Sequence, residues 1–400
     1  MNKPQLELAD VFRNIDSAAR EESGLFVSAT QRRVLRDITV CRTAALGGHL
    51  EQCDQCGHSQ IAYNSCRNRH CPKCQAAARA EWLDDRAAEL LPVEYFHIVF
   101  TLPQQLAPLA LQNKHTVYGL LFRAASETLL EIAADPRRLG AKIGFLAVLH
   151  TWGQTLQHHP HLHCVVPGGG PSPDASRWIA CRKGFFLPVK VLSRLFRRKF
   201  VSYLREAFDD GTLVFAGQVG DLAQKGRFER LLDELSRIEW VVYAKKPFGG
   251  PRQVLKYLAR YTHRVAISNH RLLELKDGRV TFSYKDYAAG NVTKTMTLAV
   301  CEFTRRFLLH VLPRGFVRIR HYGFLANRSR QQNLELCRRL LTTPAAQIAA
   351  CDVAKTELDF QAEAKCPACT QGRMIIVGKL DLLNPTYFWP ASQFLTPDTS

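Results

Sequence analysis

The sequence predicts an α+β fold, because β-rich runs and amphipathic helical segments are interspersed along the chain. Strand patterns occur at residues 95–103, 143–152 and 161–167, and helical periodicity occurs at 115–135 and 189–207. The chain has 400 residues, of which 46% are hydrophobic and 22% are charged. This length and composition predict two or three globular domains and exclude collagen-like, disordered and coiled-coil proteins.

The first predicted domain, residues 1–92, combines helices with a cysteine-rich segment. Helices are expected within residues 8–46, where Ser28 or Thr30 is a suitable N-cap. Several cysteines follow, and a further helix is expected at residues 75–91. Their spacing, discussed below, predicts the chemistry of this domain.

The second predicted domain, residues 93–330, mixes the strands and helices above with later elements. A loop is expected at residues 168–175, a strand at 239–245 and a helix at 252–263. A hairpin at residues 271–286 and a helix at 301–311 follow. Asp277-Gly278 is a typical two-residue hairpin turn. Residues 331–400 form a C-terminal extension whose last residues are expected to be frayed.

The charge balance predicts a polyanionic partner. The chain has 54 Lys and Arg against 36 Asp and Glu, a net charge of +18. Such an excess is typical of proteins that bind nucleic acid, although a basic surface without a dedicated partner is the alternative. No apolar stretch approaches the roughly 18 residues of a membrane span, so no membrane partner is expected. The N-terminus has no apolar signal-peptide core, which predicts a cytoplasmic protein.

The cysteine spacing predicts a structural zinc site. Without a secretion signal the 13 cysteines are expected to be reduced, which favours metal binding over disulfides. Two knuckles of the form Cys-x2-Cys supply the four thiolates that tetrahedral zinc prefers. We therefore expect one structural zinc ribbon that also contacts DNA. Cys66, His70 or His58 could replace one thiolate or serve a second ion. The expected ligands of the ribbon are Cys53, Cys56, Cys71 and Cys74.

A second pair, Cys366-Pro-Ala-Cys369, is half of a metal site. Cys351 and Cys337 are the nearest cysteines that could complete it. The alternative is that these thiols are packed without metal. The spacing leaves both interpretations open.

Residues 158–166 read His-His-Pro-His-Leu-His-Cys-Val-Val. Side chains alternate along a strand, so His159, His161 and His163 are expected on one face. Two imidazoles two residues apart can bind one divalent cation, whereas a lone histidine would more often be a packed core residue. The third ligand is open among four nearby residues, of which we select Gln154. The others are Gln157, His158 and His159.

Tyr257 and Tyr261 stand four residues apart in a segment of helical character, so both phenols are expected on one face. Alone, such a pair would more often be an aromatic stripe packed on a core. Nearby cations would attract a phosphate and lower the pKa of a phenol. The cations that we expect to contact DNA are Lys245, Lys246, Lys256, Arg260 and Arg264.

Together these motifs resemble the two-tyrosine rolling-circle transposases of bacterial insertion sequences, the insertion-sequence-ninety-one type. This family belongs to the HUH endonucleases. The resemblance covers nearly the whole chain, and five motifs in this order make it specific. They are CDQCGHSQIAYNSCRNRHCPKC, VFTLP, HPHLHCVVPGGG, YLARYTHRVAISNHRL and EFTRRFLLHVLP with RIRHYG.

The resemblance implies an HUH-endonuclease-like antiparallel sheet with flanking helices, preceded by the helical zinc-ribbon domain. It implies that His161 and His163 hold Mg²⁺ or Mn²⁺ and that Tyr257 and Tyr261 are the nucleophiles. The implied reaction nicks and rejoins single-stranded DNA at element ends through a 5′-phosphotyrosine, which conserves the bond energy without a nucleotide cofactor. The chain would then act in the bacterial cytoplasm, at the nucleoid.

No G-x4-G-K-[ST] phosphate loop is present, so we expect a host helicase, supercoiling or replication to expose the strand. Three other functions remain open. A rolling-circle replication initiator would use the same site. A histidine-triad nucleotide hydrolase would need no tyrosine pair, and a zinc-ribbon DNA-binding regulator would form no covalent adduct.

Overall fold

A computed structural model describes most of the chain in two compact units. Unit 1 comprises Met1–Glu81, His263–Val311 and Lys355–Ser400, and unit 2 comprises Trp82–Thr262 and Leu312–Ala354. Both units are therefore assembled from separate stretches of sequence, unlike the three consecutive domains expected. The residues described are 6–15, 27–75, 82, 86–245, 266–287, 289–342, 365–380 and 388–390.

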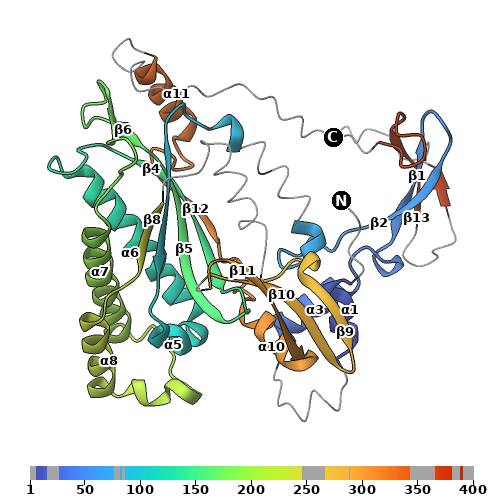
Figure 1. Cartoon of the computed structure of the whole chain (residues 1–400), viewed down its shortest axis with the longest axis horizontal. Coiled ribbons are helices and arrows are strands. Elements are labelled where there is room, and N and C mark those ends of the chain that lie inside the picture. Colours follow the sequence, from blue (N-terminus) through green and yellow to red (C-terminus); the bar gives the residue numbers. More distant parts are fainter. Residues whose placement is uncertain are drawn as a thin grey trace, which may run out of the picture. The chain divides into compact units, whose positions relative to one another are not determined.

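Unit 2 contains a five-stranded sheet in the order β12-β4-β5-β3-β8, and every neighbouring pair is antiparallel (Figure 1). The α+β class and the expected strands are confirmed. Apolar, β-branched and aromatic residues dominate the central strands and favour this pleated, buried arrangement. The strands are β3 (Tyr95–Thr101), β4 (Gly144–Trp152), β5 (His158–Pro167), β8 (Val242–Lys245) and β12 (Ile319–Gly323).

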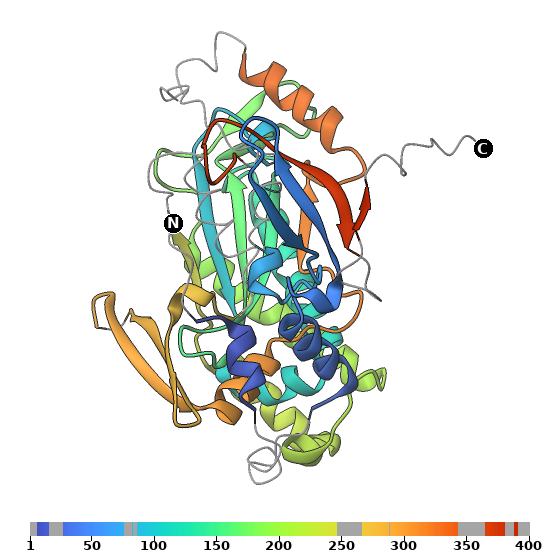
Figure 2. The same ribbon diagram turned by 90° about the vertical axis from the view of Figure 1, so that its right-hand side faces the viewer.

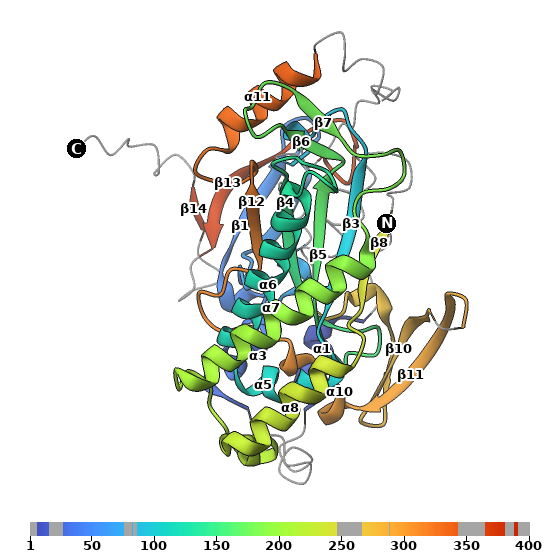
Figure 3. The ribbon, with the colours of Figure 1, turned by 90° about the vertical axis from the view of Figure 1, so that its left-hand side faces the viewer.

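Helices cover one face of this sheet. Figure 3 shows α6 (Lys114–Ala134) and α7 (Val189–Asp209) lying across the strands. Leu162 of β5 is fully buried on this side, in the same core as residues of both helices. Since side chains alternate, His161 and His163 point to the opposite face. Further helices in the described part of unit 2 are α5 (Ala107–Gln112), α8 (Lys225–Arg237) and α11 (Arg330–Leu341).

Unit 1 contains short helices and a three-stranded sheet, β11-β10-β9. Its described helices are α1 (Leu8–Arg13), α3 (Ala29–Thr39) and α10 (Val300–Leu309), and its strands are β9 (Leu272–Lys276), β10 (Arg279–Asp286) and β11 (Val292–Ala299). The expected N-cap is confirmed, because Ser28 Oγ accepts a hydrogen bond from the Gln31 amide at 3.3 Å.

The hairpin turn of this sheet also agrees with the sequence. Asp277 and Gly278 both have positive φ, 49° and 66°, as a type I′ turn requires. The third strand, β11, was not expected. Its residues are mostly exposed, and Lys294 interrupts the apolar positions Val292, Met296 and Leu298 that alternate with threonines.

A small sheet in unit 1 joins distant parts of the chain, in the order β14-β13-β1-β2. Figure 2 shows β13, in red, beside the blue strand β1. The C-terminal segment 365–380, expected to be peripheral, therefore extends the cysteine-rich ribbon. The strands are β1 (Gly48–Cys53), β2 (Ser59–Tyr63), β13 (Met374–Leu380) and β14 (Phe388–Pro390).

The shorter elements lie between these. They are η1 (Ala44–Leu46), η2 (Gln104–Leu106), β6 (Gly169–Pro171), β7 (Trp178–Ala180), η3 (Gly217–Ala223) and η4 (Asn269–Arg271). Within the described part of the chain, no helix has the length and apolar character needed to cross a bilayer.

Candidate active site and metal centres

Three histidines form a cluster on the sheet face opposite α6 and α7. His150 lies on β4, and His161 and His163 lie on β5, with one nitrogen atom of each within 4.8 Å of the others. His150 is the cross-strand partner of His161. Directly opposed residues of an antiparallel pair share a face, so this register brings the third histidine to the other two. We call these residues the histidine cluster.

His150 was not among the ligands expected from the sequence, for which Gln154 was selected instead. Gln154 lies in the turn between β4 and β5. The motif FLAVLHTW was recognised as a strand, and pairing it with residues 158–166 across a tight turn could have found His150. The role of Gln154 as a ligand stays a prediction.

Burial keeps His161 and His163 uncharged near neutral pH. Desolvation lowers the pKa of His161 to about 4 and that of His163 well below its usual range. Neutral imidazoles have a free lone pair and are the form that binds metal. The donor set therefore fits a divalent cation.

Hydrogen bonds orient two of these rings. Nδ1 of His161 donates to the carbonyl oxygen of His159 at 2.6 Å, which leaves Nε2 as the lone-pair nitrogen. Nδ1 of His163 lies 2.7 Å from Nε2 of His97, which comes from the neighbouring strand β3. If Nδ1 of His163 donates in this pair, its Nε2 also remains for a cation. Such outer contacts fix ring orientation at metal sites.

The edge strand β8 carries a cation on the same face. Lys245 is the cross-strand partner of His97, and Tyr243 is the partner of Val99. Burial, together with the Lys245 ammonium, lowers the pKa of His97 to about 4. Lys245 Nζ lies 5.5 Å from the centre of the Tyr243 ring, which is 45% exposed. One of the five expected DNA contacts therefore lies close to the histidine cluster.

The other expected residues of this site lie outside the described part of the chain. They are Tyr257, Tyr261, Lys246, Lys256, Arg260 and Arg264. Cys351, which was considered for a second metal site, also lies outside it.

The cysteines form two four-membered groups instead of the single group expected. The first cysteine cluster is Cys41, Cys66, Cys71 and Cys74, and the second is Cys53, Cys56, Cys366 and Cys369. The two knuckles expected to share one ion are therefore separated. Strand pairing explains this correction, because β1 ends at Cys53 and pairs with β13, which brings the C-terminal pair to the first knuckle.

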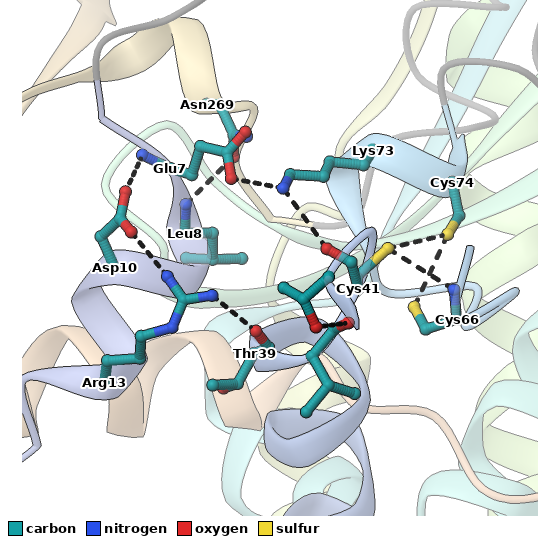
Figure 4. A network of polar contacts seen from close by, with 12 residues as sticks. Glu7, Leu8, Asp10, Arg13, Thr39, Cys41, Cys66, Lys73, Cys74 and Asn269 are labelled. Atoms are coloured by element: carbon teal, nitrogen blue, oxygen red, sulfur yellow. Dashed lines mark hydrogen bonds and ion pairs between the residues drawn. The ribbon is translucent and has the colours of Figure 1, made fainter. Parts of the chain in front are cut away.

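The first cysteine cluster has the dimensions of a zinc site. The Sγ atom of Cys74 lies 3.5 Å from that of Cys41 and 3.6 Å from that of Cys66 (Figure 4). Four sulfurs about 2.3 Å from a tetrahedral zinc would be about 3.8 Å apart. Cys41 was not among the expected ligands, because it stands alone in the sequence, 25 residues before Cys66.

Polar contacts connect this cluster to the first helix. Lys73 Nζ lies 2.5 Å from a carboxylate oxygen of Glu7 and donates to the carbonyl oxygen of Cys41 at 3.5 Å (Figure 4). His70, named as a substitute ligand, is not a member of the cluster. Its Nδ1 lies 3.0 Å from the side-chain oxygen of Asn68.

Cys337, the other candidate partner of the C-terminal pair, lies apart from both clusters. It is fully buried in unit 2 among Leu91, Phe324 and Leu334. Ordinary apolar packing explains its position.

A histidine cluster on an antiparallel sheet, a cysteine-rich unit and a charge of +18 are together typical of metal-binding proteins that have a nucleic-acid partner. A family model described as "Transposase zinc-binding domain" matches residues 11–102, and one described as "Putative transposase" matches residues 144–333. The chain belongs to the transposase family of the IS91 type. It is therefore a transposase, a class of protein that acts on DNA.

Two relatives support this assignment. The chain is 57% identical over 393 residues to "Putative transposase y4qJ" of Sinorhizobium fredii, covering 96% of this chain and 98% of that protein. It is 28% identical over 308 residues to the transposase for insertion sequence element IS801 of Pseudomonas savastanoi pv. phaseolicola, covering 74% of this chain and 72% of that protein. No solved structure matches the chain.

The matched zinc-binding domain contains all four residues of the first cysteine cluster. The expectation of structural zinc is thereby confirmed in its general form. Which cysteines bind each ion stays a prediction.

Proposed function

We propose that this transposase nicks and rejoins single-stranded DNA at the ends of its element through a 5′-phosphotyrosine intermediate, as in rolling-circle transposition. The observation that carries the proposal is the cluster of His150, His161 and His163 on strands β4 and β5, on the sheet face opposite α6 and α7. The sequence adds the Tyr257-x3-Tyr261 pair, and the family supplies DNA as the substrate.

In the proposed step, the phenol of Tyr257 or Tyr261 releases its proton to solvent and its oxygen attacks a DNA phosphorus. The bond from phosphorus to the 3′-oxygen breaks, and that oxygen takes up a proton to become a free 3′-hydroxyl. The 5′-phosphate remains esterified to the tyrosine. Because the phosphodiester energy is conserved, a 3′-hydroxyl can reverse the step without a nucleotide cofactor. A second tyrosine allows a second strand to be cleaved while the first is held.

The histidine cluster fits a divalent cation, proposed here as Mg²⁺ or Mn²⁺. When bound, the cation would supply positive charge to the non-bridging phosphate oxygens in the transition state. Three imidazole ligands favour Mn²⁺ over Mg²⁺, which prefers oxygen ligands. His97 would hold the ring of His163 in the ligating orientation through the 2.7 Å contact.

Lys245 and Tyr243 suggest where the DNA strand approaches this site. A lysine neutralises a phosphate, and an exposed aromatic ring can stack on an unpaired base. A host helicase, supercoiling or replication would supply the unpaired strand. Because the proposed substrate is bacterial genomic DNA, the proposal implies a cytoplasmic, nucleoid-associated protein.

The test is a covalent-adduct assay with single-stranded oligonucleotides that carry the element ends, with and without Mn²⁺, read on a denaturing gel. We expect an adduct with the wild-type chain, its loss in the Tyr257→Phe/Tyr261→Phe double variant and its loss in His161→Ala. An adduct that persists in the double variant would assign the nucleophile elsewhere. Salt-sensitive DNA binding without any adduct, in a chain that retains its zinc, would instead indicate a DNA-binding regulator.

A further inference from the structure

The second cysteine cluster joins the first and the last of the three stretches of chain that form unit 1. Cys53 Sγ lies 3.7 Å from Cys369 Sγ, and Cys56 Sγ lies 3.6 Å from Cys366 Sγ. All four sulfurs are within 4.8 Å of one another. The members of each close pair are more than 300 residues apart in sequence.

The sulfur spacing indicates metal ligation and excludes a disulfide in this arrangement. A disulfide requires about 2.05 Å between sulfurs, whereas the edge of a tetrathiolate zinc site is about 3.8 Å. Simple apolar packing is also a poor explanation, because Cys56 is exposed. Four thiols gathered at the edge of a sheet, with one of them facing solvent, are typical of a zinc knuckle pair.

Backbone amides point at the sulfurs on both sides. In the first knuckle, the amides of Gln55 and Cys56 donate to Cys53 Sγ at 3.4 and 3.5 Å. In the C-terminal turn, the Ala368 amide donates to Cys366 Sγ at 3.4 Å and the Gly372 amide donates to Cys369 Sγ at 3.3 Å. Donors directed at sulfur stabilise the thiolate, which is the form that binds metal.

The two turns are locked together beside the sulfurs. The Arg373 amide donates to the Asp54 carboxylate at 2.8 Å, and the Asp54 amide donates to the Arg373 carbonyl at 3.0 Å. Gly372 lies so close to the first knuckle that an added Cβ would collide with Cys53 Sγ. These contacts hold the two turns in the position that brings the four sulfurs together.

We propose that Cys366 and Cys369 complete a second structural zinc site with Cys53 and Cys56. On binding, each ligating thiol gives up its proton to solvent. The zinc-binding unit then extends beyond the matched residues 11–102, which contain only half of these ligands. The second ion then holds segment 365–380, including strand β13, on the N-terminal ribbon, in addition to the pairing of β13 with β1.

The first test is the zinc content of the purified full-length chain, measured by mass spectrometry of the metal. We expect two zinc ions per chain in the wild type. The Cys366→Ser/Cys369→Ser variant is expected to retain one, and so is the reciprocal Cys41→Ser/Cys74→Ser variant. Cys181→Ser, which lies outside both clusters, is the control for loss of a thiol and should retain two. A single ion in the wild type, or two in Cys366→Ser/Cys369→Ser, overturns the proposal.

A second test does not depend on how the serine variants fold. Cys369→His keeps a zinc ligand at this position but removes one of the eight thiolates of the two cysteine clusters. In the cobalt-substituted protein, the thiolate-to-cobalt absorption should therefore fall by about one-eighth. Hydrogen exchange then reports on the strand. Amides of Met374–Leu380 should lose protection in Cys366→Ser/Cys369→Ser and keep it in Cys369→His. Unchanged absorption in Cys369→His, or unchanged protection in the serine variant, contradicts the proposal. None of these readouts depends on DNA cleavage.

Discussion

His150 on β4 lies directly opposite His161 on β5, in a cross-strand pair that faces away from α6 and α7. This pair, together with His163, determines the donor set of the histidine cluster. It also gives a prediction that distinguishes His150 as the third metal ligand from Gln154, the residue selected from the sequence.

His150→Ala is expected to lower Mn²⁺-dependent adduct formation by at least about 100-fold, because the cluster would lose one of three ligands. Gln154→Ala, from the adjacent turn, is expected to change it only a few-fold. The measurement is the initial rate of adduct formation at several Mn²⁺ concentrations. The opposite ranking of the two variants would restore Gln154 as the third ligand.

His97 is expected to act as a positioning residue for His163. His97→Ala should weaken Mn²⁺ affinity about 10- to 100-fold, the usual effect of losing an outer contact to a metal-binding histidine. His97→Gln, whose side chain can still accept a hydrogen bond, should recover part of the lost Mn²⁺ affinity. The readout is the Mn²⁺ concentration for half-maximal activity, since the rate at saturating Mn²⁺ should change less. Equal loss at all Mn²⁺ concentrations would argue against positioning.

Lys245 and Tyr243 are expected to contribute differently to DNA binding. Lys245→Ala should reduce the slope of log affinity against log salt by about 0.7, the value for one phosphate contact on a single strand. Tyr243→Ala should cost about 1–3 kcal/mol of binding and leave the slope unchanged, because stacking releases no counterions. Fluorescence anisotropy with a single-stranded oligonucleotide at several salt concentrations measures both. Identical slopes for wild type and Lys245→Ala would exclude the contact.

Gly372→Ala is expected to weaken the second cysteine cluster selectively, because the new methyl group would collide with Cys53 Sγ. Competition with a zinc chelator should remove one ion from this variant sooner than from the wild type. Gly220→Ala is a matched control, since a Cβ there meets no atom within 4 Å. Equal zinc release from all three proteins would contradict the close approach.

His321 on β12 predicts a pH dependence of stability. Burial, with the positive charges of Arg330 and Arg86, lowers the pKa of His321 to about 4 from the ordinary 6.5. Glu89 faces the same arginines, at 3.0 Å from Arg86 and 3.1 Å from Arg330. The unfolded chain therefore binds the proton more readily, and stability is lost as pH falls from 6.5 towards 4.

His321→Gln removes this titration and keeps an acceptor for Arg86, whose Nη1 lies 3.5 Å from the ring. Thermal unfolding at pH 7 and pH 4.5 should show a smaller loss in the variant, by about 1–2 kcal/mol after allowance for solvent screening. Other groups titrate equally in both proteins. A parallel pH profile for the two would exclude the effect.

Much of the fold follows from local patterns. The apolar strands of the central sheet, the long helices α6 and α7 and the Asp277-Gly278 turn all agree with the sequence prediction. Strand β11 was missed, although Val292, Met296 and Leu298 alternate with threonines, because Lys294 interrupts this face and most of the strand is exposed. The composition of unit 1 was missed because it joins three separate stretches of chain.

The sequence by itself determined the residue types and their local geometry. Alternation along the strand placed His161 and His163 on one face. The two-residue spacer allows both sulfurs of each Cys-x2-Cys pair to reach one ion. Only the tertiary structure decided the partners. Strand register brought His150 to the histidine pair, and the pairing of β1 with β13 exchanged the expected partner of Cys53 and Cys56 for Cys366 and Cys369. Short-range periodicity fixes the direction of a side chain, but long-range pairing, which depends on the packing of the whole unit, fixes its neighbours.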